Sequence, residues 1–155
     1  MGITKRLQIL GNQGDQMKKK ILIRGPILSQ SGYGEQARFA MRAIQSREDL
    51  FDIYLHPLNW GQRIKATHAY TQQGGTFDVS LQVTIPNEFE NIATVNIGYT
   101  AGIETTKVAA SWLQKVNEMD KVIVVSNHAK DVFKDSVYTG QHRGTGASVK
   151  LTCNV

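Results

Sequence analysis

The chain has 155 residues, 41% of them hydrophobic, which suits one domain with a sizeable core. Lys and Arg outnumber Asp and Glu by 18 to 13, and the excess could meet phosphate, although Lys18-Lys19-Lys20 is more typical of a solvated flank. A single cysteine excludes an internal disulfide, and no apolar run is long enough to span a membrane, so we expect a cytoplasmic protein.

Residues 1–16 hold one short apolar patch and then a polar stretch of Gly, Asn and Gln. We predict a disordered extension here, followed by one domain over residues 17–155. An ordered edge strand through Leu7, Ile9 and Leu10 is the alternative.

Residues 21–38 have the pattern of a buried strand, a glycine loop and a helix. The apolar run breaks at Gly25-Pro26, and apolar residues recur at helical spacing from Ala37 to Ile44. The start of a helix leaves backbone N–H groups free, which favours a phosphate or a sugar hydroxyl as ligand. The glycine spacing matches neither the dinucleotide fingerprint nor the P-loop, so a tight structural turn stays as the alternative.

Further strands are predicted at residues 51–55, 77–85, 93–99 and 122–125. Residues 77–85 alternate between apolar and polar, which indicates one wetter face, whereas the β-branched run at 122–125 indicates a central strand buried on both faces. Thr105 or Thr106 is expected to cap one helix and Ser126 the next, which bears apolar residues on one side up to Val137. Residues 140–146 are predicted to form a loop, and another strand to start at Val149.

This order of elements predicts an α/β fold, namely a Rossmann-like open sheet, mainly parallel, with helices on both faces. Three strand-to-helix junctions, at residues 25–35, 100–105 and 126–128, then open at the carboxyl ends of the strands. Ligands bind at that edge in open α/β sheets.

Two acidic residues stand at these junctions. Glu104 could act as a base or accept sugar hydroxyls, and Glu35 has the same two roles open to it; the alternative for both is an acid favoured by the helix dipole. The histidines lack metal-binding spacing, so no metal site is expected. Without a G-x-S-x-G motif, Ser126 is predicted to be a cap and not a nucleophile.

Three segments together are more specific than the fold. These are Tyr99-Thr100-Ala101-Gly102-Ile103-Glu104, then Trp112, then residues 119–126, MDKVIVVS. With the S-G-Y-G-E-Q-A-R stretch after the first strand, they resemble the N-terminal, acceptor-side domain of GT-B glycosyltransferases of the GT4 type, similar to those of bacterial and tailed-phage genomes. The resemblance covers residues 18–138.

The resemblance implies one half of a GT-B fold, facing a C-terminal Rossmann-like domain or partner chain that holds most of a nucleotide-sugar. The reaction would transfer the sugar to a hydroxyl of a glycan or other acceptor, with no cofactor or obligatory metal, in the host cytoplasm if the protein is phage-encoded. Glu104 is the expected catalytic residue, and the expected ligand-binding residues are Gly32, Tyr33, Gly34, Glu35, Thr100, Thr105, Ser126 and Asn127.

Two departures from the family pattern stand out: Tyr99-Thr100 occupies a region where many relatives carry a histidine, and the donor-binding domain is absent from the 155 residues. We therefore expect the chain to be inactive alone. A stand-alone module that binds a nucleotide or glycan is the alternative. Nucleic acid is not an expected partner, since only net charge favours it.

Overall fold

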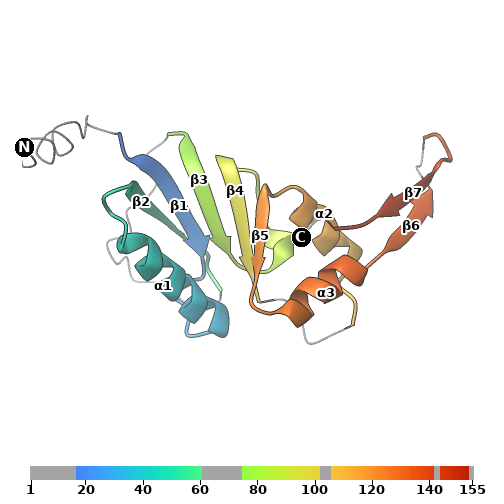
Figure 1. Ribbon diagram of the computed structural model, residues 1–155, viewed down its shortest axis with the longest axis horizontal. Coiled ribbons are helices and arrows are strands. Elements are labelled where there is room, and N and C mark those ends of the chain that lie inside the picture. Colours follow the sequence, from blue (N-terminus) through green and yellow to red (C-terminus); the bar gives the residue numbers. More distant parts are fainter. Residues whose placement is uncertain (1–16, 61–74, 102–105, 142–143, 154–155) are drawn as a thin grey trace, which may run out of the picture.

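The computed structural model describes residues 17–60, 75–101, 106–141 and 144–153. Within these residues, five strands form one parallel sheet (Figure 1). The strands are β1 (Lys19–Gly25), β2 (Phe51–Pro57), β3 (Phe77–Val83), β4 (Ala93–Thr100) and β5 (Lys121–Val124). Helices α1 (Gly32–Gln45), α2 (Ala110–Asn117) and α3 (Asn127–Asp135) accompany them, with a short 3-10 helix, η1 (Pro86–Glu88).

The sheet has the strand order β2-β1-β3-β4-β5, and each neighbouring pair is parallel. β1 therefore lies between β2 and β3, and the direction of strand addition reverses at β1. The predicted α/β class, with an open and mainly parallel sheet, is confirmed.

The two faces of the sheet have different coverings. On one face, α1 packs on Ile21, Ile23 and neighbouring side chains, and its own Ala37 is completely buried in this contact. On the opposite face, η1 and α2 pack together, and Phe89 lies directly against Gly98 of β4. Helices thus cover both faces, as the sequence predicted.

The strand at 121–124 is not the buried central strand that its β-branched sequence predicted. β5 ends the strand order, so it has one neighbour, and Ile123 is 42% exposed. β1, which has a neighbour on each side, is buried on both faces, with Ile21, Leu22 and Ile23 each at most 3% exposed. A run of β-branched residues shows that a segment suits a strand, but it does not give the strand's position in the sheet.

The prediction of a wetter face on β3 is also wrong. Ser80 and Gln82 are fully buried, because β3 lies between β1 and β4 and the connection over residues 84–92 crosses its polar face. The polar side chains bond that connection: Gln82 Nε2 donates to the Glu90 carbonyl at 2.6 Å, and Gln82 Oε1 accepts from the Glu90 N–H at 3.0 Å.

The C-terminal part forms an antiparallel hairpin of β6 (Tyr138–Gln141) and β7 (Ser148–Leu151), which projects from the main sheet (Figure 1). The sequence predicted a strand from Val149 but missed β6, because the apolar spacing carried the preceding helix on to Val137. The helix instead ends at Asp135, and the buried Ser136 at its end donates to the Val132 carbonyl at 2.7 Å.

Candidate functional site at the carboxyl edge of the sheet

The carboxyl ends of all five strands lie at one edge of the parallel sheet (Figure 1). The junctions that follow β1, β4 and β5 therefore meet at the edge where the sequence predicted ligand binding. Residues 102–105, which include the predicted base Glu104 and the predicted binding residue Thr105, lie outside the described residues.

The β1–α1 junction is a closed loop held against the start of its helix. Ser31 caps α1, and its Oγ accepts from the Gly34 N–H at 3.2 Å. Arg38 spans the loop from the second turn of the helix, donating to the carbonyls of Ile27 and Ser29 at 2.8 Å each. The loop conformation is thus fixed by the helix that it precedes.

Gly34 and Gly32 differ sharply in their surroundings. A Cβ on Gly34 would lie 2.1 Å from the Ser29 carbonyl oxygen, so this buried glycine is needed for the loop to pass over the helix. A Cβ on Gly32 would meet nothing within 4 Å. Of the two predicted binding glycines, Gly32 therefore offers the more accessible backbone.

Glu35 forms an ion pair with Arg38, with 2.5 Å between Glu35 Oε2 and Arg38 Nη2. The hydrogen bond from Arg38 and its positive charge hold the pKa of the Glu35 carboxyl below its usual value. Glu35 thus orients the arginine that fastens the loop, and half of its side chain stays exposed.

Tyr33 and Thr100, both predicted binding residues, come together at this edge. The Tyr33 hydroxyl lies 2.8 Å from Thr100 Oγ1 and accepts a hydrogen bond from the Ala101 N–H at 3.2 Å. Thr100 itself is fully buried, whereas Tyr33 is half-buried. Tyr33 is therefore the member of the pair with surface at the edge.

Trp60 and Glu88 extend this contact across the edge. The Trp60 ring packs edge-to-face on Tyr33, with 5.5 Å between ring centroids, and its Nε1 donates to Glu88 Oε1 at 3.2 Å. The other oxygen of Glu88 accepts from the Thr84 hydroxyl. We call Tyr33, Trp60, Thr84, Glu88 and Thr100 the edge network. It joins segments that follow or end β1, β2, β3 and β4.

Sequence analysis missed Trp60, Thr84 and Glu88. Glu88 follows a strand-ending proline by two residues, so it lies at the carboxyl edge of the sheet, and this position is the signal that could have identified it. Its hydrogen bond from Trp60, 28 positions away along the chain, forms only because the fold brings the two residues close, whereas the bond from Thr84, 4 positions away, is local.

A buried arginine lies behind the edge network. Arg24, only 6% exposed, donates to the Glu88 carbonyl at 2.5 Å and pairs with Glu90 at 3.0 Å. His56 is the register partner of Arg24 on β2. Burial and the Arg24 charge lower the pKa of His56, while Glu90 opposes them.

At the third junction, Ser126 caps α3 as predicted, with its Oγ accepting from the Ala129 N–H at 3.0 Å. Asn127 is exposed in the first turn. The predicted threonine cap of α2 is wrong: that helix begins at Ala110, and Ala109 at the N-cap makes no side-chain capping bond.

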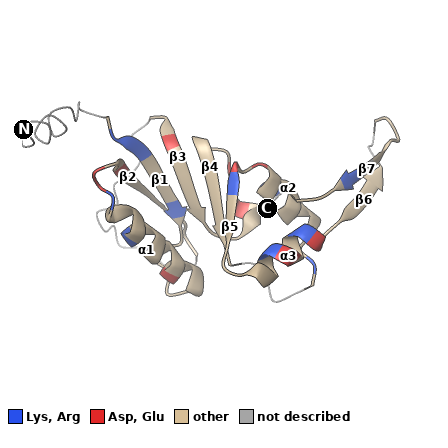
Figure 2. Ribbon diagram, in the orientation of Figure 1, with Lys and Arg blue, Asp and Glu red and all other residues tan. Residues whose placement is uncertain are grey.

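The basic run at residues 18–20 lies at the start of β1, the opposite end of the sheet from the edge network (Figure 2). Among the described residues, no group of three or more His, Cys, Asp and Glu side chains is placed to hold a metal ion. No helix in the same residues has the length and apolar character to cross a membrane.

Comparisons with known proteins add no relative. No protein-family model matches the chain, and searches of curated proteins and of solved structures return no match.

Chemically, the edge presents the Tyr33 hydroxyl, the Glu88 carboxylate, two aromatic rings and the open backbone at Gly32. Such groups suit a polar ligand that has both hydroxyls and an apolar face.

Proposed function

We propose that this chain is the acceptor-side domain of a glycosyltransferase that moves a sugar from a nucleotide-sugar to an acceptor hydroxyl. The observation that carries the proposal is the 2.8 Å contact between Tyr33 and Thr100. It joins the two junctions that resemble the glycosyltransferase pattern, at the sheet edge where such domains bind their substrates.

In this proposal the chain supplies one wall of a cleft. Gly32 and the half-buried Tyr33 and Trp60 face the acceptor, and Glu88 fixes the indole through its hydrogen bond to Nε1. Glu104 takes the proton of the acceptor hydroxyl as the oxygen bonds to the sugar and the nucleoside diphosphate leaves. A second Rossmann-like domain holds the donor, so both walls are needed for turnover. A cytoplasmic location, where nucleotide-sugars are available, is part of the proposal.

Binding can be tested on the full chain by following backbone amide signals in NMR during titration with oligosaccharides and nucleotide-sugars. We expect shifts concentrated at Gly32, Tyr33, Trp60 and Ala101. Tyr33→Phe should weaken binding several-fold, because it removes the hydroxyl that joins the two junctions. The matched control is Tyr138→Phe, which removes a hydroxyl bonded at 2.7 Å to the Val108 carbonyl, outside the edge network. Shifts located elsewhere, or equal effects of the two variants, would contradict the site.

Turnover separates this proposal from a stand-alone binding module. Nucleoside diphosphate release from nucleotide-sugars should stay at background for this chain and appear when it is joined to a donor-binding domain. Glu104→Gln in the joined protein should then lower kcat by ~100-fold or more with little change in binding. Binding without turnover in the joined protein would favour the module, and robust turnover by the chain alone would overturn the half-enzyme proposal.

A further inference from the structure

The outer edge of β2 is open in the described part of the chain, where β2 ends the strand order. The Lys19 N–H donates to the Leu50 carbonyl, and the Leu58 N–H donates to the Gly25 carbonyl. Backbone direction alternates along a strand, so the even-numbered residues of β2 bond to β1. The N–H and C=O groups of Phe51, Ile53 and Leu55 therefore point away from the sheet.

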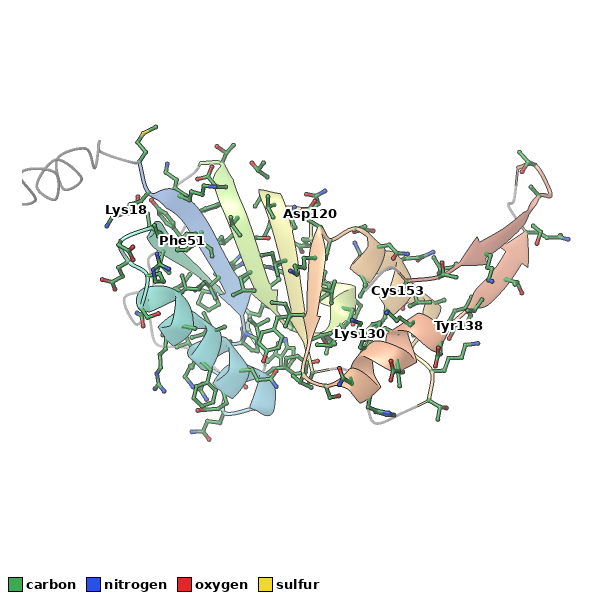
Figure 3. The ribbon with its side chains drawn as sticks, viewed as in Figure 1. Lys18, Phe51, Asp120, Lys130, Tyr138 and Cys153 are labelled. Atoms are coloured by element: carbon green, nitrogen blue, oxygen red, sulfur yellow. The ribbon has the colours of Figure 1, made fainter. Side chains whose placement is uncertain are left out.

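A hollow of about 540 Å³ runs along this edge. Five consecutive residues of β2, 51–55, form its floor, and Met41, Gln45 and Glu48 of α1 and the following turn form one wall. Lys18 lines it beside Phe51 at the amino end of the strands, where the two are labelled in Figure 3. The hollow thus combines an open row of backbone groups with space for side chains.

We propose that this edge is a self-association surface, on which a second copy of the chain adds its own β2 in antiparallel orientation. The outward groups of β2 bond to those of a second β2 when an odd-numbered residue lies opposite an odd-numbered residue. Of these registers, the one with Ile53 opposite Ile53 pairs all three outward residues, Phe51, Ile53 and Leu55, with one another. In that register Phe51 faces Leu55 on the α1 side of the sheet, and Asp52 faces Tyr54 on the other side. Apolar residues meet apolar ones, and no like charges stand opposite each other.

The two copies of α1 have room in this arrangement. α1 packs chiefly over β1, so the two helices stand three strand spacings apart, roughly 14 Å. Packed helices need 8–10 Å between their axes, so the backbones do not clash and side chains such as Met41 fill the space between them. The contact is isologous and closes as a two-fold dimer, joining two sheets into one.

Sedimentation velocity over a concentration series tests the proposal on the full chain. We expect a species of twice 17.2 kDa, the mass of one chain, at high concentration. Ile53→Pro removes an outward N–H without removing a bond to β1, whereas Ile53→Ala removes the same side chain but keeps that N–H. Ile53→Ala should still dimerise and Ile53→Pro should not. A wild-type protein that stays monomeric at all concentrations would overturn the proposal, and the edge would then be available to another strand, such as one formed by residues 1–16. Equal dimerisation of the two variants would also overturn it.

A crosslinking arm decides the case if Ile53→Pro does not fold. With the native cysteine replaced (Cys153→Ser), a cysteine introduced by Ile53→Cys lies on the two-fold axis, about 5.5 Å in Cα distance from its copy and within disulfide reach. Asp52→Cys in the same background is the matched control, because its copies lie about 8 Å apart. Selective covalent dimers of the Ile53→Cys protein under oxidation are expected. Equal crosslinking at the two positions, or none at residue 53, would overturn the register.

Discussion

Position 34 requires glycine because a larger residue has no space there, and not because of its backbone angles. Gly146 is the glycine with a positive φ among those described, so Gly34 has an ordinary helical conformation, and its constraint is the Ser29 carbonyl above it. We expect Gly34→Ala to lower the free energy of unfolding by about 2 kcal/mol or more, because the loop must shift. Gly32→Ala, in open space, should leave it unchanged or raise it by up to ~1 kcal/mol.

Urea unfolding of both glycine variants tests this prediction. Equal stability of the two would contradict the packing argument. Loss of glycan binding in Gly34→Ala without loss of stability would restore this glycine as a ligand contact, as the sequence first suggested.

His56 should make stability depend on pH. Its pKa is lower in the folded protein than the ordinary value of about 6.5, so the unfolded chain binds the proton more readily. Unfolding therefore takes up protons as the pH falls below about 6.5, and stability decreases through that range. Above about pH 6.5, the contribution of neutral His56 to stability is fully present.

We expect His56→Gln to flatten this dependence between pH 7.5 and 5.5 in urea unfolding. His128→Gln is the control, because His128 is exposed in the first turn of α3. An unchanged pH profile in His56→Gln would contradict the assignment.

At the scale of elements, the connection between β3 and β4 replaces a crossover helix with side-chain bonds. A helix satisfies its own backbone, but residues 84–92 contain only the short η1. Buried Asn96 accepts from the N–H groups of Ile92 and Ala93 at 3.0 Å each, and Gln82 makes its two bonds to Glu90. The polar face of the sheet is thus the scaffold of this connection.

Gln82→Leu should lower the free energy of unfolding by about 2–4 kcal/mol, because it leaves the Glu90 N–H and C=O without these partners. Gln114→Leu on the exposed surface of α2 should change it by no more than about 0.5 kcal/mol. Chemical denaturation with both variants measures the difference. A similar small effect at both positions would show that the connection does not depend on Gln82.

The same polar face shows where sequence reasoning fails. Alternation at residues 77–83 correctly predicted a strand, but exposed and buried polar side chains give the same pattern. Gln82 and Glu90 are eight residues apart, and their bonds form only when the connection folds back across the sheet. At the start of α1 the bonds are local, and the helix start and its serine were both within the predicted segment.

For the whole molecule, the order of strand stability should follow position in the sheet. β1 has neighbours on both sides and is buried on both faces, whereas β5 has one neighbour and an exposed face. Hydrogen exchange followed by mass spectrometry should find the slowest amides in β1 and β3 and much faster exchange in β5 and the β6–β7 hairpin. Slowest exchange in β5 would contradict this order.

The parallel sheet could be predicted because each strand and its following helix leave a local pattern. The strand order could not be predicted, since it depends on which strands pair, and the hydropathy of a strand does not show which strands lie beside it. For the same reason Tyr33 and Thr100 were predicted as separate binding residues, and only the fold reveals that they touch. Trp60 and Glu88 are likewise brought into the site by contacts between residues far apart in the sequence.

The bond between Trp60 and Glu88 also gives the protein an optical property. Trp60 lies beside a carboxylate and against the Tyr33 ring, so its emission is sensitive to changes in polarity and hydrogen bonding at the sheet edge, and Tyr33 is close enough to pass excitation energy to it. The second indole, Trp112, packs against the cluster around Leu113. With Trp112→Phe, all tryptophan fluorescence would come from Trp60, which would report on the sheet edge without an attached dye.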